Sequence, residues 1–169
     1  HELGDLFSVE IKSDDDIVKY SKKLQEMGAK NVLVSMAKDG AMLTDENGNV
    51  KTYEYDDRNN VIKETDAKGN SVIKTYNSFN KPTQVTDRNG NTTYFTYDAK
   101  GNVTRIRYPA INGVVPEETF VYNTRNQMTQ HTDIRGTVTL YTYDANGMPA
   151  TKKVGSKNAI VYSYEGGLL

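Results

Sequence analysis

The chain has 169 residues, of which 36% are hydrophobic and 25% charged, and its formal net charge is −1. This balance excludes the basic field of a nucleic-acid-binding protein, and no apolar run reaches the roughly 18 residues of a membrane span. The absence of cysteine excludes disulfides and thiolate sites. The presence of only two histidines argues against a histidine-based catalytic triad or metal cluster. We therefore expect no cofactor, no metal site, no nucleic-acid partner and no membrane insertion.

The N-terminal stretch predicts a helix followed by a strand. Ser13 and three aspartates precede the periodic apolar residues and Gly28 follows them, which is typical of a capped helix. Residues 31–36 then indicate a short buried strand. The helix carries one apolar stripe, made of Ile17, Tyr20, Leu24 and Met27. Since this fragment cannot bury its own stripe, we expect the stripe to pack against the first hairpin that follows.

The rest of the chain is a repeat. Six marker tyrosines are spaced 21, 21, 25, 21 and 21 residues apart: Tyr55, Tyr76, Tyr97, Tyr122, Tyr143 and Tyr164. An acid or amide follows each of them, from Asp56 to Glu165, and a second marker, Thr-Asp-x-x-Gly, keeps the same period. One four-residue insertion near Ile111–Pro116 accounts for the irregular spacing. A short period with two turns per unit predicts sequential antiparallel β-hairpins.

The turn residues carry their own predictions. The residues four positions after the marker tyrosines accept a left-handed backbone: Asn59, Asn80, Gly101, Asn126 and Gly147. Asn89-Gly90 predicts a tight turn in which both residues have positive φ. The aspartates at the turn starts are expected to accept hydrogen bonds from their own turns. A calcium loop or a glycosidase-like carboxylate pair is a weaker alternative, because the distal Glu of a calcium loop is missing.

A second aromatic column stands two residues before the markers, and strand alternation puts both columns on one face. Together they form a ladder of Tyr53, Tyr55, Tyr76, Phe95, Tyr97, Phe120, Tyr122, Tyr141, Tyr143, Tyr162 and Tyr164. We expect this aromatic ladder to be the inward face of the sheet, with a carbohydrate-binding platform as the alternative. Lys74 interrupts it and indicates that part of the face is wet. His131 has no evident partner for catalysis and is predicted to be a surface histidine.

Residues 44–169 resemble the YD repeats of the RHS family, because they repeat the motifs Tyr-Asp-x-x-Gly-Asn and Thr-Asp-x-x-Gly. The resemblance implies sheets of β-hairpins that coil into shells in bacterial wall-associated proteins and toxins, where the repeats are not enzymes. It implies an extracellular or cell-wall-associated scaffold or interaction module. Its expected partners are a cell-wall glycan or another protein, and open sheet edges favour self-association.

Residues 1–43 resemble sugar kinases of the ribokinase (phosphofructokinase-B) family, through HELGDLF and SDDDIVKYSKKLQEMGAKNVLVSMAKDGAML. Glu2 corresponds to the Glu of that family's Asn-x-x-Glu motif, which contributes to the magnesium and phosphate region. The resemblance implies a cytoplasmic origin for this part. The Gly-Ala-Gly-Asp motif with the catalytic base is not found in the chain, so we expect no kinase activity, although a remnant that binds nucleotide is an alternative.

The sequence thus predicts a fusion of two stretches, residues 1–43 and 44–169. The expected fold is mainly β: an open twisted sheet of sequential antiparallel hairpins with a 21-residue period, capped by an N-terminal α/β element. The expected function is that of a non-enzymatic structural or interaction module.

Overall fold

The computed structural model describes residues 2–164 and is mainly β, with helices only in its N-terminal part. These are α1 (Glu2–Phe7), α2 (Asp14–Glu26) and the single-turn η1 (Ala37–Asp39). The chain divides into two compact units, His1–Asn91 and Thr92–Leu169. The marker acid Glu165 lies outside the described residues.

The first unit carries six strands, each antiparallel to the next. They are β1 (Val32–Ser35), β2 (Ala41–Thr44), β3 (Val50–Tyr55), β4 (Val61–Thr65), β5 (Ser71–Tyr76) and β6 (Pro82–Thr86). The second unit carries seven, again antiparallel and in sequence order. They are β7 (Thr92–Tyr97), β8 (Val103–Arg107), β9 (Glu117–Tyr122), β10 (Met128–Thr132), β11 (Val138–Tyr143), β12 (Pro149–Val154) and β13 (Ile160–Val161).

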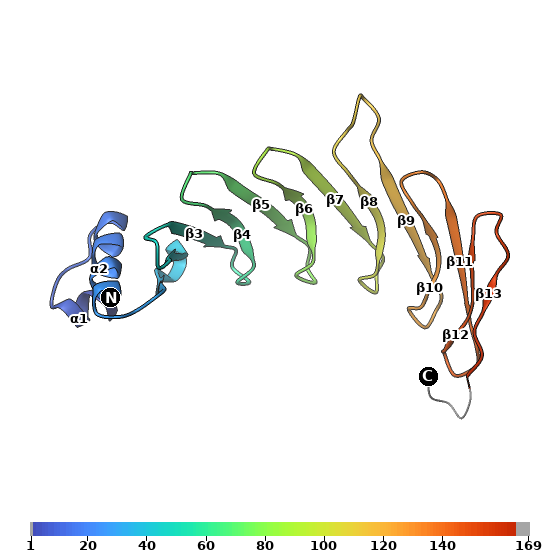
Figure 1. The fold of residues 1–169 in the computed structure, drawn as a ribbon, viewed down its shortest axis with the longest axis horizontal. Helices are drawn as coiled ribbons and strands as arrows, with labels where there is room; N and C mark the ends of the chain where they lie inside the picture. The colour runs from blue at the N-terminus through green and yellow to red at the C-terminus, as the bar shows by residue number, and fades with distance from the viewer. Residues whose placement is uncertain (1, 165–169) are drawn as a thin grey trace. The chain divides into compact units, whose positions relative to one another are not determined.

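Within each unit, successive hairpins lie side by side (Figure 1). The predicted fold class, sequential antiparallel β-hairpins with an N-terminal α/β element, is therefore confirmed. The predicted division at residues 43 and 44 falls inside β2, which pairs with β1 on one side and with β3 on the other. The kinase-like stretch and the first repeat are thus joined through continuous strand pairing.

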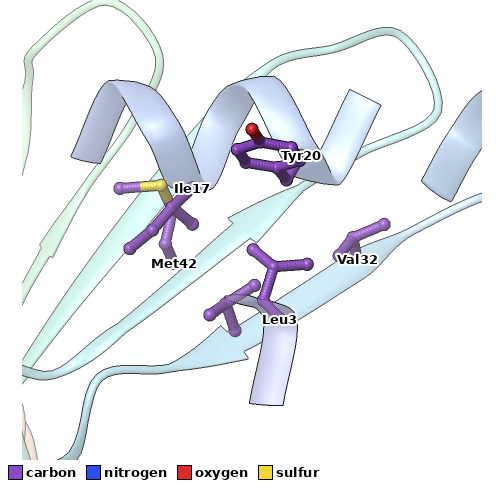
Figure 2. Close-up of a cluster of buried hydrophobic side chains, with 6 residues drawn as sticks. Leu3, Ile17, Tyr20, Val32 and Met42 are labelled. Atoms are coloured by element: carbon purple, nitrogen blue, oxygen red, sulfur yellow. The ribbon is translucent and has the colours of Figure 1, made fainter. Parts of the chain in front are cut away.

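The buried core of the described chain lies in the N-terminal α/β element. The side chain of Ser13 accepts a hydrogen bond from the Asp16 N–H (3.2 Å) and starts α2 as predicted. Figure 2 shows the residues that α2 brings together with α1, β1 and β2. The buried cluster consists of Leu3, Ile17, Tyr20, Val32, Val34 and Met42. The apolar burial of the described chain is therefore concentrated at its N-terminal end.

The predicted stripe of α2 is confirmed for three of its four residues. Ile17 and Tyr20 are buried, and Leu24 packs against the same cluster. The expectation for Met27 is wrong, because the helix ends at Glu26 and the Met27 side chain is 73% exposed. The strand expected to be buried is buried on one face only: Leu33 is 67% exposed.

α2 covers the face of the sheet that lies opposite the aromatic ladder. The register pairs Val34 with Met42, and Met42 lies in the α2 cluster. Tyr53 pairs with Ala41, the residue before Met42, so strand alternation sends its ring to the other face. The helix therefore shields β1 and β2 without covering the ladder.

Two hydroxyl groups are buried without a hydrogen-bond partner in this element. Ser21 on α2 and Thr44 on β2 are fully buried, and no described group bonds their side-chain oxygens. We expect Thr44→Val, which keeps the shape and removes the orphaned hydroxyl, to raise the free energy of unfolding by about 1–2 kcal/mol. Urea denaturation followed by circular dichroism measures this. Thr142→Val is the control, because the Thr142 hydroxyl is bonded to that of Thr151 (2.7 Å), and it should give no gain.

The prediction of two left-handed residues at Asn89-Gly90 is wrong for Asn89. At Asn89-Gly90 only Gly90 has a positive φ (83°), because the Asp87 carboxylate accepts the Asn89 N–H and fixes another geometry. Both residues are left-handed at Asn112 (φ 51°) and Gly113 (φ 78°). There they close a small loop bridged by Ile111 and Val114 inside the four-residue insertion.

Candidate functional site

The aromatic ladder of the repeats is half-buried. None of its members belongs to the buried core. Nine of the eleven side chains are partly covered, while Tyr55 and Tyr162 are exposed. Each of these side chains therefore keeps part of its surface accessible.

Three of the six marker tyrosines bond a neighbouring hairpin through their hydroxyl groups. The hydroxyl of Tyr76 donates to the carbonyl oxygen of Val61 (2.8 Å), and that of Tyr143 donates to Met128 (2.8 Å). Tyr164 donates to Pro149 in the same way (2.7 Å). Each bond reaches 15 residues back along the chain, to the strand that follows the previous Tyr-Asp turn. Burial raises the pKa of Tyr76 and Tyr143 above the ordinary tyrosine value.

The other column makes contacts across its own hairpin. The Phe120 ring stacks on the His131 ring, with centroids 4.8 Å apart and planes 4° from parallel. The Lys152 ammonium lies 5.9 Å from the centroid of the Tyr141 ring. Both partners are the residues paired with the aromatic ring in the strand register. At Phe120 and Tyr141 the column therefore forms cross-strand pairs between an aromatic ring and a polar side chain.

A polar cluster that the sequence did not predict interrupts the ladder in the second unit. The Tyr108 hydroxyl donates to one oxygen of Glu118 (2.7 Å), and His131 Nε2 lies 2.5 Å from the other. The hydrogen bond from Tyr108, aided by His131, holds the pKa of Glu118 below its ordinary value. The prediction of a surface histidine missed this bond, which leaves the His131 side chain 25% exposed. Its partner became identifiable only once the register placed β8, β9 and β10 side by side.

The acids at the turn starts bind their own turns, as predicted. Asp98 Oδ1 accepts the N–H groups of Lys100 and Asn102 (2.9 Å each). Asn123 makes the same two bonds, to Arg125 and Gln127. The residues expected to be left-handed all have positive φ: Asn59 63°, Asn80 56°, Gly101 81°, Asn126 62° and Gly147 86°. Side-chain chemistry and backbone conformation therefore define the turn together.

Acid should weaken these turns. Hydrogen bonds from the side chain and backbone of Asn102 hold the pKa of Asp98 below its ordinary value of 3.8. The unfolded state therefore takes up a proton at a higher pH, and stability present at neutral pH is lost as the pH falls through this range. Urea denaturation from about pH 6 to about pH 3 should show a smaller loss for Asp98→Asn than for the parent. Asn123 shows that an amide supports the same turn. An unchanged pH dependence would contradict this.

Neighbouring turns are also bonded to each other. Arg58 Nη1 donates to the Asn77 carbonyl (2.7 Å), and Lys100 Nζ donates to that of Thr124 (2.7 Å). The amide of Asn60 bonds that of Asn80 (3.0 Å). Side chains therefore link the Tyr-Asp ends of adjacent hairpins within each unit. The carboxylates and amides of these turns form hydrogen bonds that hold the hairpins together.

The kinase-like element holds a groove of about 640 Å³ beside β1. Leu3, Leu6, Leu24 and Val34 line it together with Glu2. Its described lining has a carboxylate and no basic side chain, the opposite of what a phosphate group requires.

In residues 2–164 no group of three or more histidine or acidic side chains is arranged to hold a metal ion. None of the helices in this part is both long and apolar enough to cross a membrane.

Comparison with solved structures shows the same fold in toxin complexes. The crystal structure of TcdB2-TccC3 matches 69% of this chain and 7% of its own, with a TM-score of 0.60 and 12% identity. A structure of the Photorhabdus luminescens Tc holotoxin pore matches 86% of this chain and 10% of its own, with a TM-score of 0.53 and 15% identity. At these identities the likeness is one of fold.

Two sequence matches cover different lengths of the chain. The 1-phosphofructokinase of Bacillus subtilis (strain 168) is 56% identical over 43 residues, which are 25% of this chain and 14% of that enzyme. The chain thus spans a small part of the kinase it matches. The RHS Repeat family matches residues 41–71, 76–110 and 122–157. Because these matches cover more than half of its length, the chain belongs to the RHS repeat family.

Proposed function

We propose that the chain is a non-enzymatic structural module from an RHS scaffold of a bacterial surface or toxin-delivery protein, fused to an inactive sugar-kinase fragment. The observation that supports this proposal is that polar side chains of the repeats form structural hydrogen bonds within the array. Turn carboxylates accept bonds from their own turns, and marker tyrosine hydroxyls bond the preceding hairpin. The proposed location of the repeats is extracellular or cell-wall-associated, in keeping with the RHS family.

The proposed partner class is another protein. The Tc toxin structures with the same fold are named as complexes of protein components. In this chain the ladder face carries half-buried rings, and α2 covers the opposite face. An uncovered aromatic face of this kind suits contact with a protein surface.

A pair of tyrosine variants tests the structural role of the marker column. Tyr143→Phe removes the bond to the Met128 carbonyl, so we expect it to lower the free energy of unfolding by about 1 kcal/mol. Tyr141→Phe is the matched control two residues away, because no hydroxyl bond of Tyr141 is found among the described residues, and it should be near neutral. Urea denaturation of both variants gives the comparison. Equal stabilities of the two variants would contradict the structural role of the marker tyrosines.

The alternative of a nucleotide-binding kinase remnant predicts a different result. A ligand that binds the folded state must raise the melting temperature. Since the groove beside β1 lacks basic side chains, we expect magnesium-ATP to leave the melting temperature of the full chain unchanged. A concentration-dependent rise would favour the kinase alternative over the scaffold.

A carbohydrate-binding ladder is the second candidate, favoured by the accessible sides of its rings. Soluble cell-wall polysaccharide should then raise the melting temperature of the parent, and Tyr141→Ala should reduce the rise. Leu140→Ala is the control, because Leu140 is exposed on the opposite face of the same strand. A rise that both variants retain, or no rise at all, would remove the glycan from consideration.

A further inference from the structure

Four Asn-Gly pairs occur in the chain, and the structure places them in two different settings. The pairs are 47–48, 89–90, 112–113 and 146–147. Asn followed by Gly is the pair most open to attack by the backbone nitrogen on the side-chain amide, because Gly has no side chain to hinder the approach. Since all four share this local sequence, differences in reactivity must come from the structure around them.

Three of the pairs lie in turns headed by an aspartate, which hold the attacking nitrogen. The N–H of Gly48 donates to the Asp45 carbonyl (2.8 Å), that of Gly90 to Asp87 (3.0 Å) and that of Gly147 to Asp144 (3.1 Å). The carboxylate of each aspartate accepts further backbone bonds within the same turn. Attack on the asparagine side chain requires these turns to open first.

The pair Asn112-Gly113 lies at the tip of the insertion between β8 and β9, outside any such turn. Two backbone bonds hold the tip, from the Ile111 N–H to the Val114 carbonyl (2.8 Å) and back (3.0 Å). Within residues 2–164, the Gly113 N–H has no hydrogen-bond partner, and nothing lies within 4 Å of the place a Cβ would occupy. The flanking Ile111 and Val114 are 65% and 68% exposed.

We propose that Asn112 is a site of spontaneous deamidation, which acts on the folded protein at this position before the other three. The Gly113 nitrogen loses its proton to a buffer base and bonds Asn112 Cγ. The protonated base then returns a proton to the side-chain nitrogen, and the bond from that nitrogen to Cγ breaks to release ammonia. Water then opens the succinimide ring to an aspartyl or isoaspartyl residue. The product carries a carboxylate at an otherwise apolar tip. Its isoaspartyl form has one more backbone carbon, which the two-residue turn between Ile111 and Val114 cannot accommodate.

Peptide mapping by mass spectrometry tests this on the full chain, aged in mildly alkaline buffer, with all four sites read in one sample. Asn112 should convert about tenfold faster than Asn47, Asn89 and Asn146, because the turn bonds that protect those sites must break first. In urea, where the turns are lost, the four rates should converge. Equal rates in buffer, or an unchanged lead of Asn112 in urea, would overturn the proposal.

A variant separates the cause. Asp87→Ala removes the carboxylate that binds the Asn89 and Asn91 N–H groups. It should raise the rate at Asn89 severalfold and leave the rate at Asn112 unchanged. If the Asn89 rate does not change, protection by the aspartate turn is not the reason for the difference.

Discussion

Replacing Gly40 with Ala is expected to abolish the cooperative folding of the N-terminal α/β element. Gly40 precedes β2 with φ 106°, and a Cβ there would overlap the carbonyl oxygen of Tyr53 on β3. Neither backbone can move without breaking the β2–β3 pairing, so the expected loss is about 4 kcal/mol or more. Urea denaturation followed by the helical circular dichroism signal measures it.

Gly28→Ala is the matched control for this variant. Gly28 has a similar φ of 110°, and nothing lies within 4 Å of its Cβ position. It therefore isolates the strain of a left-handed backbone, which should cost about 1–2 kcal/mol. If Gly40→Ala were no worse than Gly28→Ala, the close approach of β2 and β3 would not matter for stability.

Introducing a charge into the stripe of α2 is expected to have the second large effect. Ile17 is 4% exposed and packs in the cluster with Leu3 and Met42. Ile17→Asp would bury an unpaired carboxylate and lose the apolar contacts, so we expect it to lower the free energy of unfolding by about 3–5 kcal/mol. The melting temperature should fall accordingly.

The same helix supplies the control. Met27 follows the last turn of α2 and is largely exposed, so Met27→Asp should melt close to the parent. An Ile17→Asp variant that melts like Met27→Asp would show that the helix is a passenger and contributes nothing to the fold.

The repeats could be predicted from the sequence because their rules are local. The left-handed residues such as Asn59 and Gly101 and the turn acids such as Asp98 act within five residues of chain. The 21-residue period therefore predicted both the hairpins and the conformation of their turns. The stripe of α2 followed from periodicity in the same way, except at Met27, where the helix had already ended.

Features that depend on pairing between strands were not predictable from the sequence. Whether the ladder rings face a second layer is decided by the whole fold, and α2 lies on the opposite face from Tyr53. The Glu118–His131 bond joins residues 13 apart whose encounter depends on the register of β9 and β10. At Asn89-Gly90 only Gly90 is left-handed, because the Asp87 carboxylate accepts the Asn89 N–H and fixes another turn.

The bonds between neighbouring turns suggest how an array of this kind changes length in evolution. The Asn60–Asn80 bond spans 20 residues and the Asn102–Asn126 bond spans 24, yet both join corresponding positions. The extra four residues lie wholly in the loop between β8 and β9, at the other end of the strands. Insertions at that end leave the bonds between the Tyr-Asp turns intact. The loops at one end of the hairpins can therefore change in length while the turns at the other end keep adjacent hairpins aligned.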